Sequence, residues 1–526
     1  MPPSRLTQIF HLNARLRSWA ANSLLVLLML AGFGLRLIDL TDQPLDFHPA
    51  RQLRAAIIAR GMYAQMLSAQ PDAPHWQASA ETAGLSPLNY DPRQAQAAVA
   101  MWQGMAIYEP QILERLVALP YWLLGAELLW VARIYSVLFW TLGGMALFLL
   151  ARKATSFAGG ITSLACYLFV PLGVFASRAF QPDPLMVALL LWAAYAAYRW
   201  SEARSWRWAL LTGLFSGLAV LVKAPAFFQI GWLLIFTVLS GWGIKQAVRQ
   251  PQVWAAGVLA ALIPAAYYLL LKEDRSDGYL EFWSASFSAM LLEPGFYIRW
   301  LVFVQQNVVE ISLFFAGLAG SLLFERRGKA IALGLWIGYA CIGLTLPYLI
   351  TTHDYYSLPL LPAIAFSLAP LAPPLIQVVH RQAKIWQAAF YAVLVLAVLY
   401  PAWIARSALV GQDYRQEALG WQALAQELPT DGRIIAITHD YGHRLRYYGW
   451  VSVSLWPTTA DQALTGEQFD PAEFDRLFTG RTAGYDYFLI TLPKELAAQP
   501  QLAEMLNNHY PLLADQGGYL LYDLTP

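Results

Sequence analysis

The sequence predicts a mainly α-helical, polytopic membrane protein with a soluble α/β domain at its C-terminal end. Of its 526 residues, 58% are hydrophobic and only 13% are charged, and the mean hydropathy is +0.43. A soluble globular domain is a poor explanation for this balance. Long apolar runs follow one another up to residue 405, and residues 406–526 have the composition of a soluble unit. We therefore expect a transmembrane domain at 1–405 and an α/β domain at 406–526.

The apolar runs predict about eleven transmembrane helices of roughly 15 to 23 residues, and most of them are long enough to cross about 30 Å of hydrocarbon. Two neighbouring runs lie so close together that a re-entrant pair kinked at Pro225 stays open as an alternative. The expected spans are 20–38, 132–151, 160–177, 184–199, 208–222, 225–242, 253–271, 301–323, 331–350, 357–378 and 386–405.

Basic residues predict the orientation of these spans. In every second gap between the runs there are Lys and Arg residues, fifteen in total, for example Arg152 with Lys153 and Arg326 with Arg327. These gaps are cytoplasmic if the amino terminus is inside. We expect a multi-pass protein of the inner or plasma membrane, whose first helix is a retained anchor because no small-residue cleavage signature follows it. The exoplasmic segments are then about 39–131, 272–300, 351–356 and the tail from 406.

Charge and cysteine content exclude several classes of function. The net charge of +1 argues neither for nor against an acidic partner, and the sequence has no basic run with interleaved aromatic residues that would indicate nucleic-acid binding. Cys166 and Cys341 both lie inside apolar spans, so the sequence offers neither a disulfide framework nor a CxxC metal site. It also lacks the GxGxxG, Walker and GxSxG patterns of nucleotide-binding proteins and hydrolases.

The C-terminal domain has the pattern of an α/β fold. Arg433–Thr438 (RIIAIT) is typical of a buried strand. About 120 residues are enough for a core of their own. His439, Asp440, His443 and Arg444 are a candidate metal site, although two His on a strand-to-helix turn are more often surface residues. The expected elements are helices at 417–428 and 501–507 and strands at 433–438, 485–491 and 518–522.

The first external loop, about 39–131, holds an unusual number of charged side chains. A loop of this length is uncommon unless it is functional or disordered. Pro49–Gln65 has helical spacing and predicts an amphipathic helix at the membrane interface. Asp46 precedes this helix and is a candidate general base, which would take a proton from an acceptor hydroxyl or amine. From spacing alone, a cap of the helix or an ion pair with Arg51 is the commoner role.

Three further polar sites lie where apolar spans end on the predicted outer side. Charges at membrane depth are costly, so these residues are functional candidates by default. Asp183 is equally compatible with capping the helix that follows it. Lys223 is equally compatible with snorkelling to the outer interface. The three sites are Ser177–Pro184 (SRAFQPDP), Val222–Pro225 (VKAP) and Thr352–Pro359 (THDYYSLP).

The third site contains four candidate residues. Tyr355 and Tyr356 are also compatible with an aromatic belt at the interface. His353 and Asp354, which lie between two spans, are harder to explain in that way.

The ordered set of motifs resembles the GT-C glycosyltransferases. The resemblance covers about 10–380 and is strongest to the bacterial aminoarabinose-transferase and protein O-mannosyltransferase-like group. Its motifs are an acidic residue after the first span, Tyr108-Glu109-Pro110, Leu129–Arg133 (LWVAR), SRAFQPDPLM, LAVLVKAP and HDYYSLPLLPAIA. The tail from 406 resembles the periplasmic domains that some members carry.

This resemblance implies inverting transfer of a sugar from a polyprenyl-phosphate donor to an envelope acceptor (lipid, glycan or protein) at the outer face of the membrane. Asp46 matches the catalytic base of the family, and Glu109 matches a residue that orients the acceptor or a metal. The sequence departs from the family pattern because Phe47 follows the first site and Gln111 follows Glu109-Pro110. The implied substrate-binding residues are His48, Arg51, Arg178, Asp183, Lys223, Arg299, His353, Asp354, Tyr355 and Tyr356, of which Arg178, Lys223 or Arg299 would supply the positive charge for the donor phosphate.

Several alternatives stay open. His48, Glu109 and His353 are candidate ligands of a divalent cation, and no other cofactor is implied. The implied partners are the lipid-linked donor, the acceptor and the bilayer, without nucleic acid. Many spans with proline and isolated charges are also compatible with a transporter or flippase, or with a noncatalytic scaffold. Neither of these needs a base at Asp46.

Overall fold

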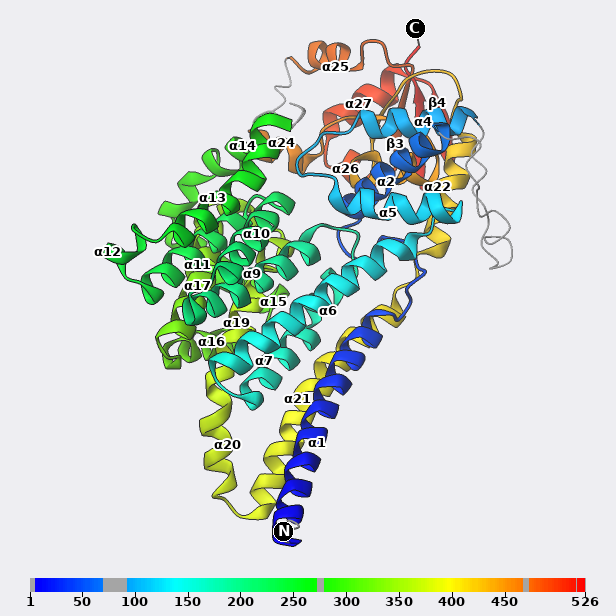
Figure 1. Cartoon of the computed structure of the whole chain (residues 1–526). Helices are drawn as coiled ribbons and strands as arrows, with labels where there is room; N and C mark the ends of the chain where they lie inside the picture. The colour runs from blue at the N-terminus through cyan, green and yellow to red at the C-terminus, as the bar shows by residue number, and fades with distance from the viewer. Residues whose placement is uncertain (1–4, 70–91, 272–278, 467–472, 517, 526) are drawn as a thin grey trace. The chain divides into compact units, whose positions relative to one another are not determined.

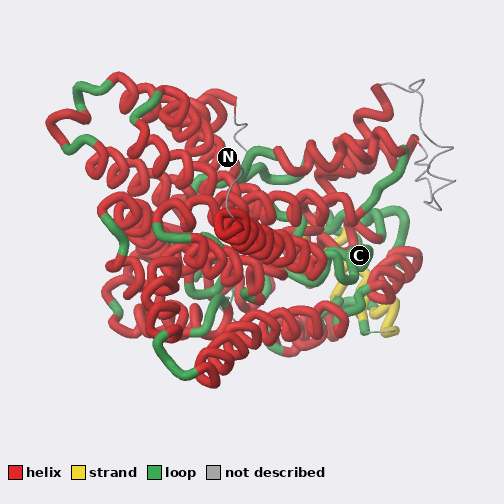
Figure 2. The backbone as a smooth tube through the Cα atoms, turned by 60° about the horizontal axis from the view of Figure 1, so that its bottom comes forward, coloured by secondary structure: helices red, strands yellow, loops and turns green. Residues whose placement is uncertain are grey.

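The computed structural model describes residues 5–69, 92–271, 279–466, 473–516 and 518–525 (Figure 1). It is mostly helical, and Figure 2 shows the strands gathered in one place beside the C-terminus. The chain forms two compact units. The first comprises residues 1–41, 106–113 and 130–412, and the second comprises 42–105, 114–129 and 413–526. The segment 70–91 of the predicted external loop and the start of 272–300 lie outside the described residues.

The first unit is a bundle of apolar helices (Figure 1). By length and composition, five helices of the described residues are able to cross a membrane, or six if Glu281–Leu292 and Pro294–Asn307 form one bent span. Five shorter apolar helices accompany them. The helices are α1 (Arg5–Arg36), α6 (Leu129–Ala154), α7 (Phe157–Phe169), α8 (Pro171–Ala176), α9 (Asp183–Ala203), α10 (Trp206–Val222), α11 (Ala226–Gly241), α12 (Ile244–Ala247), α13 (Pro251–Ala265), η1 (Ala266–Leu271), α14 (Tyr279–Ala285), η2 (Ser288–Leu292), α15 (Pro294–Asn307), α16 (Ile311–Leu323), α17 (Arg326–Thr345), α18 (Pro347–Ile350), η3 (Asp354–Ser357), α19 (Leu360–Leu368), η4 (Ala369–Leu371), α20 (Ala372–His380) and α21 (Lys384–Gly411).

Among the expected spans, two are each divided into two helices near their middle. The run at 160–177 is divided into α7 and α8, because Pro171 cannot continue the hydrogen bonds of α7 and instead starts α8. The run at 301–323 is divided into α15 and α16, because Glu310 has an extended ψ of 132°. The total of about eleven spans stays a prediction.

Paired glycines bring helices of the first unit into close contact. Gly334 and Gly338 of α17 face α11, and a Cβ at Gly334 would lie 2.7 Å from the Cα of Leu233. Gly213 and Gly217 of α10 face α13, where a Cβ at Gly213 would lie 2.6 Å from a backbone oxygen. Both pairs have the small-xxx-small spacing that lets membrane helices approach closely.

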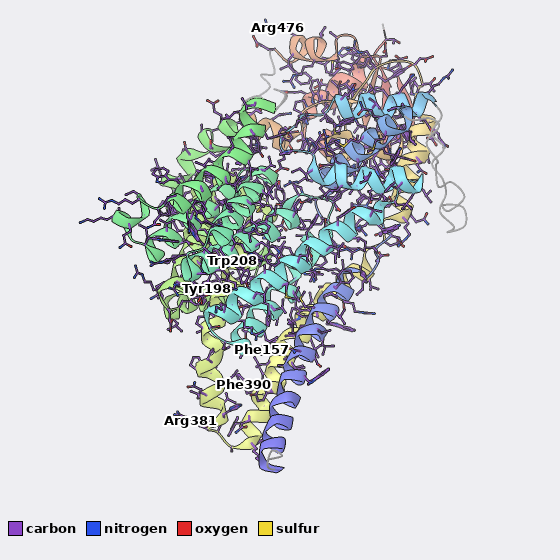
Figure 3. All side chains as sticks on the ribbon, viewed as in Figure 1. Phe157, Tyr198, Trp208, Arg381, Phe390 and Arg476 are labelled. Atoms are coloured by element: carbon purple, nitrogen blue, oxygen red, sulfur yellow. The ribbon has the colours of Figure 1, made fainter. Side chains whose placement is uncertain are left out.

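Basic side chains at the predicted cytoplasmic ends lie beside aromatic rings. The Arg199 guanidinium lies 4.9 Å from the ring centre of Trp208, and that of Arg152 lies 5.9 Å from Phe157 (both rings are labelled in Figure 3). Arg381 lies in the turn between α20 and α21 (Figure 3). Arginine over an aromatic face is a favourable contact that also suits a membrane interface. The orientation of the bundle stays a prediction.

The second unit contains a five-stranded sheet of order β2-β1-β3-β5-β4, in which β2, β1 and β3 are parallel and β5 and β4 are antiparallel additions. The predicted strands at 433–438, 485–491 and 518–522 are confirmed, while β2 and β4 were not expected. Trp456, Phe478 and Phe488 lie in its core. The elements are α2 (Pro49–Ala69), α4 (Pro92–Gln103), α5 (Ile112–Leu124), α22 (Arg415–Glu427), β1 (Ile434–Ile437), η5 (His439–Gly442), α23 (His443–Tyr448), β2 (Ser454–Leu455), α24 (Thr459–Thr465), α25 (Phe474–Thr482), β3 (Tyr487–Ile490), α26 (Pro493–Ala497), α27 (Pro500–His509), β4 (Leu512–Gln516) and β5 (Tyr519–Asp523).

Helix α2 is present as predicted, but its expected amphipathic character is wrong. Nearly every residue from Gln52 to Ala64 is buried, on all sides of the helix. The helix packs against α4 and α23 of the same unit, so protein rather than a membrane surface covers it. Arg60 of this helix pairs with Glu127 at 2.9 Å and donates a hydrogen bond of 2.6 Å to the backbone oxygen of Tyr447.

Candidate functional site

Asp46 lies in a tight turn that leads into α2. Leu45 and Phe47 on either side of it are buried, which anchors the backbone of the turn. The Gln52 side-chain amide donates to the Asp46 carboxylate at 3.0 Å and to the Phe47 backbone oxygen at 2.8 Å. His48 has a φ of +49°, and its carbonyl accepts the first N–H groups of α2. The turn therefore holds the Asp46 carboxylate in one orientation.

The turn is fastened on both sides of Asp46 to the C-terminal part of the second unit. Before it, the buried Asp42 carboxylate accepts the Tyr414 backbone N–H at 3.1 and 3.2 Å. After it, the Ala50 backbone N–H donates to Asp440. Burial raises the pKa of Tyr414, and the charges of Asp46 and Asp42 raise it further. Segments of the first loop and of the C-terminal tail thus build the surroundings of Asp46 together.

In the first unit, Asp183 and Lys223 form a buried ion pair. Asp183 is the first residue of α9, Lys223 directly follows α10, and Lys223 Nζ lies 2.5 Å from Asp183 Oδ1. Their side chains are only 1% and 3% exposed. The alternative that Lys223 snorkels to the interface is therefore wrong, and the Asp183 carboxylate binds a lysine 40 positions along the chain.

Two tyrosines complete this cluster. Lys223 Nζ lies 4.9 Å from the ring centre of Tyr355 and 4.8 Å from that of Tyr356, both on η3. Both tyrosines are buried, so the belt alternative for them is wrong. Four of the predicted substrate-binding residues, drawn from α9, the end of α10 and η3, therefore meet in one place: Asp183, Lys223, Tyr355 and Tyr356.

Residues 110–269 match the family model described as dolichyl-phosphate-mannose-protein mannosyltransferase. The fold resembles ArnT from Cupriavidus metallidurans bound to undecaprenyl phosphate, with a TM-score of 0.54 and 14% identity over 96% of this chain and 98% of that one. The comparisons thus show a family match over this segment and a shared fold over most of the chain. The fold also resembles the archaeal oligosaccharyltransferase AglB from Archaeoglobus fulgidus in complex with an inhibitory peptide and a dolichol-phosphate, with a TM-score of 0.55 and 13% identity over 93% of this chain and 71% of that one. No functionally curated protein matches the sequence.

Glu109 lies near the end of α10 that precedes Lys223. Its charge acts on Tyr268 of η1, and the Tyr268 hydroxyl donates 3.2 Å to the backbone oxygen of Leu221, two residues before Lys223. Ser357, the last residue of η3, has its hydroxyl 2.8 Å from the Tyr339 hydroxyl of α17. Polar contacts thus fix the elements around the lysine.

The two other predicted phosphate-binding cations have different surroundings. Arg178 is buried and donates 2.8 Å to the backbone oxygen of Asp39, which follows α1. Arg299 is half-exposed and pairs with Glu293 at 2.8 Å. The predicted His353 has its Nδ1 2.7 Å from the Thr352 hydroxyl. Lys223 thus sits among other predicted site residues, namely Asp183, Tyr355 and Tyr356.

Sequence reasoning missed two arginines inside apolar spans. Arg36, near the end of α1, donates a hydrogen bond of 2.5 Å to the Ser177 hydroxyl and one of 2.7 Å to the Gly32 backbone oxygen. Arg133 of α6 donates 2.9 Å to the Asp39 backbone oxygen. A charge within an apolar span was the signal that would have found both.

The candidate metal sites find no support among the residues that the structure describes. Within the described ranges, no three His, Cys, Asp or Glu side chains are grouped to hold a metal ion. In the candidate cluster of the C-terminal domain, His439 Nδ1 lies 3.3 Å from the Thr491 hydroxyl, and Asp440 and Glu417 both pair with Arg444. These contacts account for His439, Asp440 and Arg444 without a metal, whereas the buried Nδ1 of His443 has no hydrogen-bond partner among the described residues.

Proposed function

We propose that this protein is a GT-C glycosyltransferase, which transfers a sugar from a polyprenyl-phosphate donor to an envelope acceptor, with inversion, at the exoplasmic face of the inner or plasma membrane. The observation that supports this proposal most strongly is the Asp46 carboxylate, held by Gln52 in a turn that is fastened on both sides. A general base must be positioned before the reaction begins, because proton transfer depends on geometry as well as on pKa. The relatives bound to undecaprenyl phosphate and dolichol-phosphate support a lipid-linked donor.

The Lys223 cluster is the proposed site for the donor phosphate. A charge buried in an apolar bundle is costly and is kept mainly where it has a function. Lys223 has Asp183 as its counter-ion and two tyrosines beside it. A cation and hydroxyl donors together stabilise the negative charge that develops on a leaving phosphate.

The proposed reaction has one bond made and one broken. Asp46 takes the proton from the acceptor hydroxyl or amine, and the acceptor oxygen or nitrogen attacks the anomeric carbon of the sugar. The bond from that carbon to the phosphate oxygen breaks, its electron pair stays on the phosphate, and polyprenyl phosphate leaves. Attack opposite to the leaving group inverts the anomeric configuration. Glu109 is the proposed residue that orients the acceptor.

The proposal is tested by product analysis with the purified full-length protein in detergent. It is incubated with a panel of polyprenyl-phosphate sugars and an envelope lipid and glycan extract, and polyprenyl phosphate release is followed by mass spectrometry. We expect release from at least one donor and a product of inverted anomeric configuration by NMR. A retained configuration would contradict the single-displacement mechanism. Absence of release from every donor by folded protein would favour the transporter alternative.

A further inference from the structure

The second unit contains a cavity whose lining does not include the residues of the Asp46 turn. Its volume is about 310 Å³, within the range of small-molecule sites. One wall is the small and apolar side of α4, and the other carries two polar side chains. The lining residues are Ala97, Ala100, Met101, Gly104, Arg446 and Ser452.

Arg446 has an unusual environment for a partly buried arginine. Its buried Nε donates to no acceptor, and no carboxylate pairs with its guanidinium, among the residues that the structure describes. Burial lowers the pKa of Arg446. Arginines of the same unit are satisfied in the usual way, since Arg60 pairs with Glu127 and Arg444 pairs with Asp440 and Glu417. Partly buried cations are normally paired, so this site has positive charge without a matching negative charge.

A second group on the same helix supports this charge imbalance. His443 lies one turn before Arg446 on α23, and its buried Nδ1 has no hydrogen-bond partner among the described residues. Burial lowers the pKa of His443 to about 3, and the positive charges of Arg446 and Arg54 contribute. Two arginines, Arg446 and Arg54, therefore place positive charge near His443.

We propose that this cavity binds the acidic group of a sugar unit, either a carboxylate or a phosphate. The guanidinium of Arg446 would bind two oxygens of that group side by side. The Ser452 hydroxyl is available at the wall for a sugar hydroxyl, and the apolar side of α4 would contact the ring. The identification of this sugar as part of the acceptor rests on the proposed function, whereas the binding itself does not.

Binding is tested by isothermal titration calorimetry of the full-length protein in detergent at constant ionic strength. The probes are glucuronate, glucose 6-phosphate, neutral glucose, and micelles containing phosphatidylglycerol. We expect the two acidic sugars to bind and glucose to bind at least about tenfold more weakly, the loss that goes with about 1.4 kcal/mol. Equal binding of glucose would overturn the proposal. Binding of phosphatidylglycerol without either acidic sugar would overturn the assignment to a saccharide.

Variants identify the cavity as the site. Arg446→Gln should weaken binding of the acidic sugars at least about tenfold. Arg476→Gln is the matched control, because Arg476 is highly exposed in the same unit (Figure 3), and it should bind as the wild type does. Ala100→Trp, a change at an exposed position of α4, should block the cavity even if Arg446→Gln folds poorly. Unchanged binding in both cavity variants would contradict the proposal.

The experiment also separates this inference from the proposed reaction. Asp46→Asn should bind acidic sugars like the wild type, because Asp46 does not line the cavity. If Asp46→Asn loses transfer but still binds acidic sugars, the result concerns only the role of Asp46 as the base. If Asp46→Asn loses binding but keeps transfer, the result overturns only the proposal for the cavity.

Discussion

Breaking the buried ion pair between Lys223 and Asp183 should strongly destabilise the helical unit. Lys223→Met leaves a carboxylate that is 1% exposed without its cation, and Asp183→Leu leaves an ammonium that is 3% exposed without its anion. Removing one partner of a buried pair typically costs about 3–5 kcal/mol. Lys223→Met also removes the contacts with two tyrosine rings, each worth about 0.5–2 kcal/mol.

The double substitution should recover most of this loss. Replacing both charges by apolar groups removes the desolvation cost as well as the attraction, and such exchanges are often neutral or stabilising. We expect the Lys223→Met, Asp183→Leu variant to lie within about 1 to 2 kcal/mol of the wild type, which gives a coupling energy of about 3 kcal/mol or more.

Unfolding in mixed detergent micelles measures each corner of this double-mutant cycle. The matched control is Arg299 with Glu293, a pair at 2.8 Å whose side chains are about half-exposed, which should give a coupling below about 1 kcal/mol. The double variant should be stable but inactive if Lys223 binds the donor phosphate. If the single variants are as stable as the control variants, burial does not make the loss of one partner costly. A fully active double variant would refute the proposal that Lys223 binds the donor phosphate.

Two further predictions concern the second unit. His443 should make it sensitive to acid: its pKa is lowered to about 3 in the folded protein, so the unfolded chain binds more protons below its ordinary pKa of 6.5. Stability is then present above about pH 6.5 and is lost as the pH falls, by about 3 kcal/mol at pH 4. The melting temperature of His443→Gln should therefore fall less between pH 7 and pH 4 than that of the wild type, and an equal fall would contradict this. Gln52→Met should lower kcat about tenfold or more with little change in KM. The reason is that the Asp46 carboxylate loses a hydrogen bond worth about 1.5 kcal/mol or more. A change confined to KM would show that Gln52 acts on substrate binding instead.

The sequence predicted those features that depend on local pattern. Apolar runs identified the helices of the bundle, and RIIAIT and YDYFLIT identified the two central strands, β1 and β3. Lys223 and Asp183 stood out because charges are rare in apolar sequence. Their pairing was not predictable, because it depends on how α9 and α10 pack. For the same reason Asp183 was compatible with a helix cap until the lysine was found beside it.

The remaining errors come from contacts between segments far apart in the sequence. Helix α2 was expected to face a membrane on one side, whereas α4 and α23 of the same unit surround it. The burial of Arg60 was not predictable, because its partner, Glu127, lies 67 positions further on in the sequence. Gln52 gave no signal, since a neutral polar side chain on a helix is usually exposed. Only the three-dimensional structure shows that it is buried and binds Asp46.

The central claim is that Asp46 is the catalytic base, and one measurement tests it most directly. Polyprenyl phosphate release from the active lipid-linked donor is compared between wild type, Asp46→Asn and the control Asp413→Asn, which changes an exposed carboxylate of the same unit. We predict a loss of at least about 10²-fold for Asp46→Asn, with an unchanged melting temperature, and wild-type release for Asp413→Asn. Undiminished release by a well-folded Asp46→Asn protein would contradict the account.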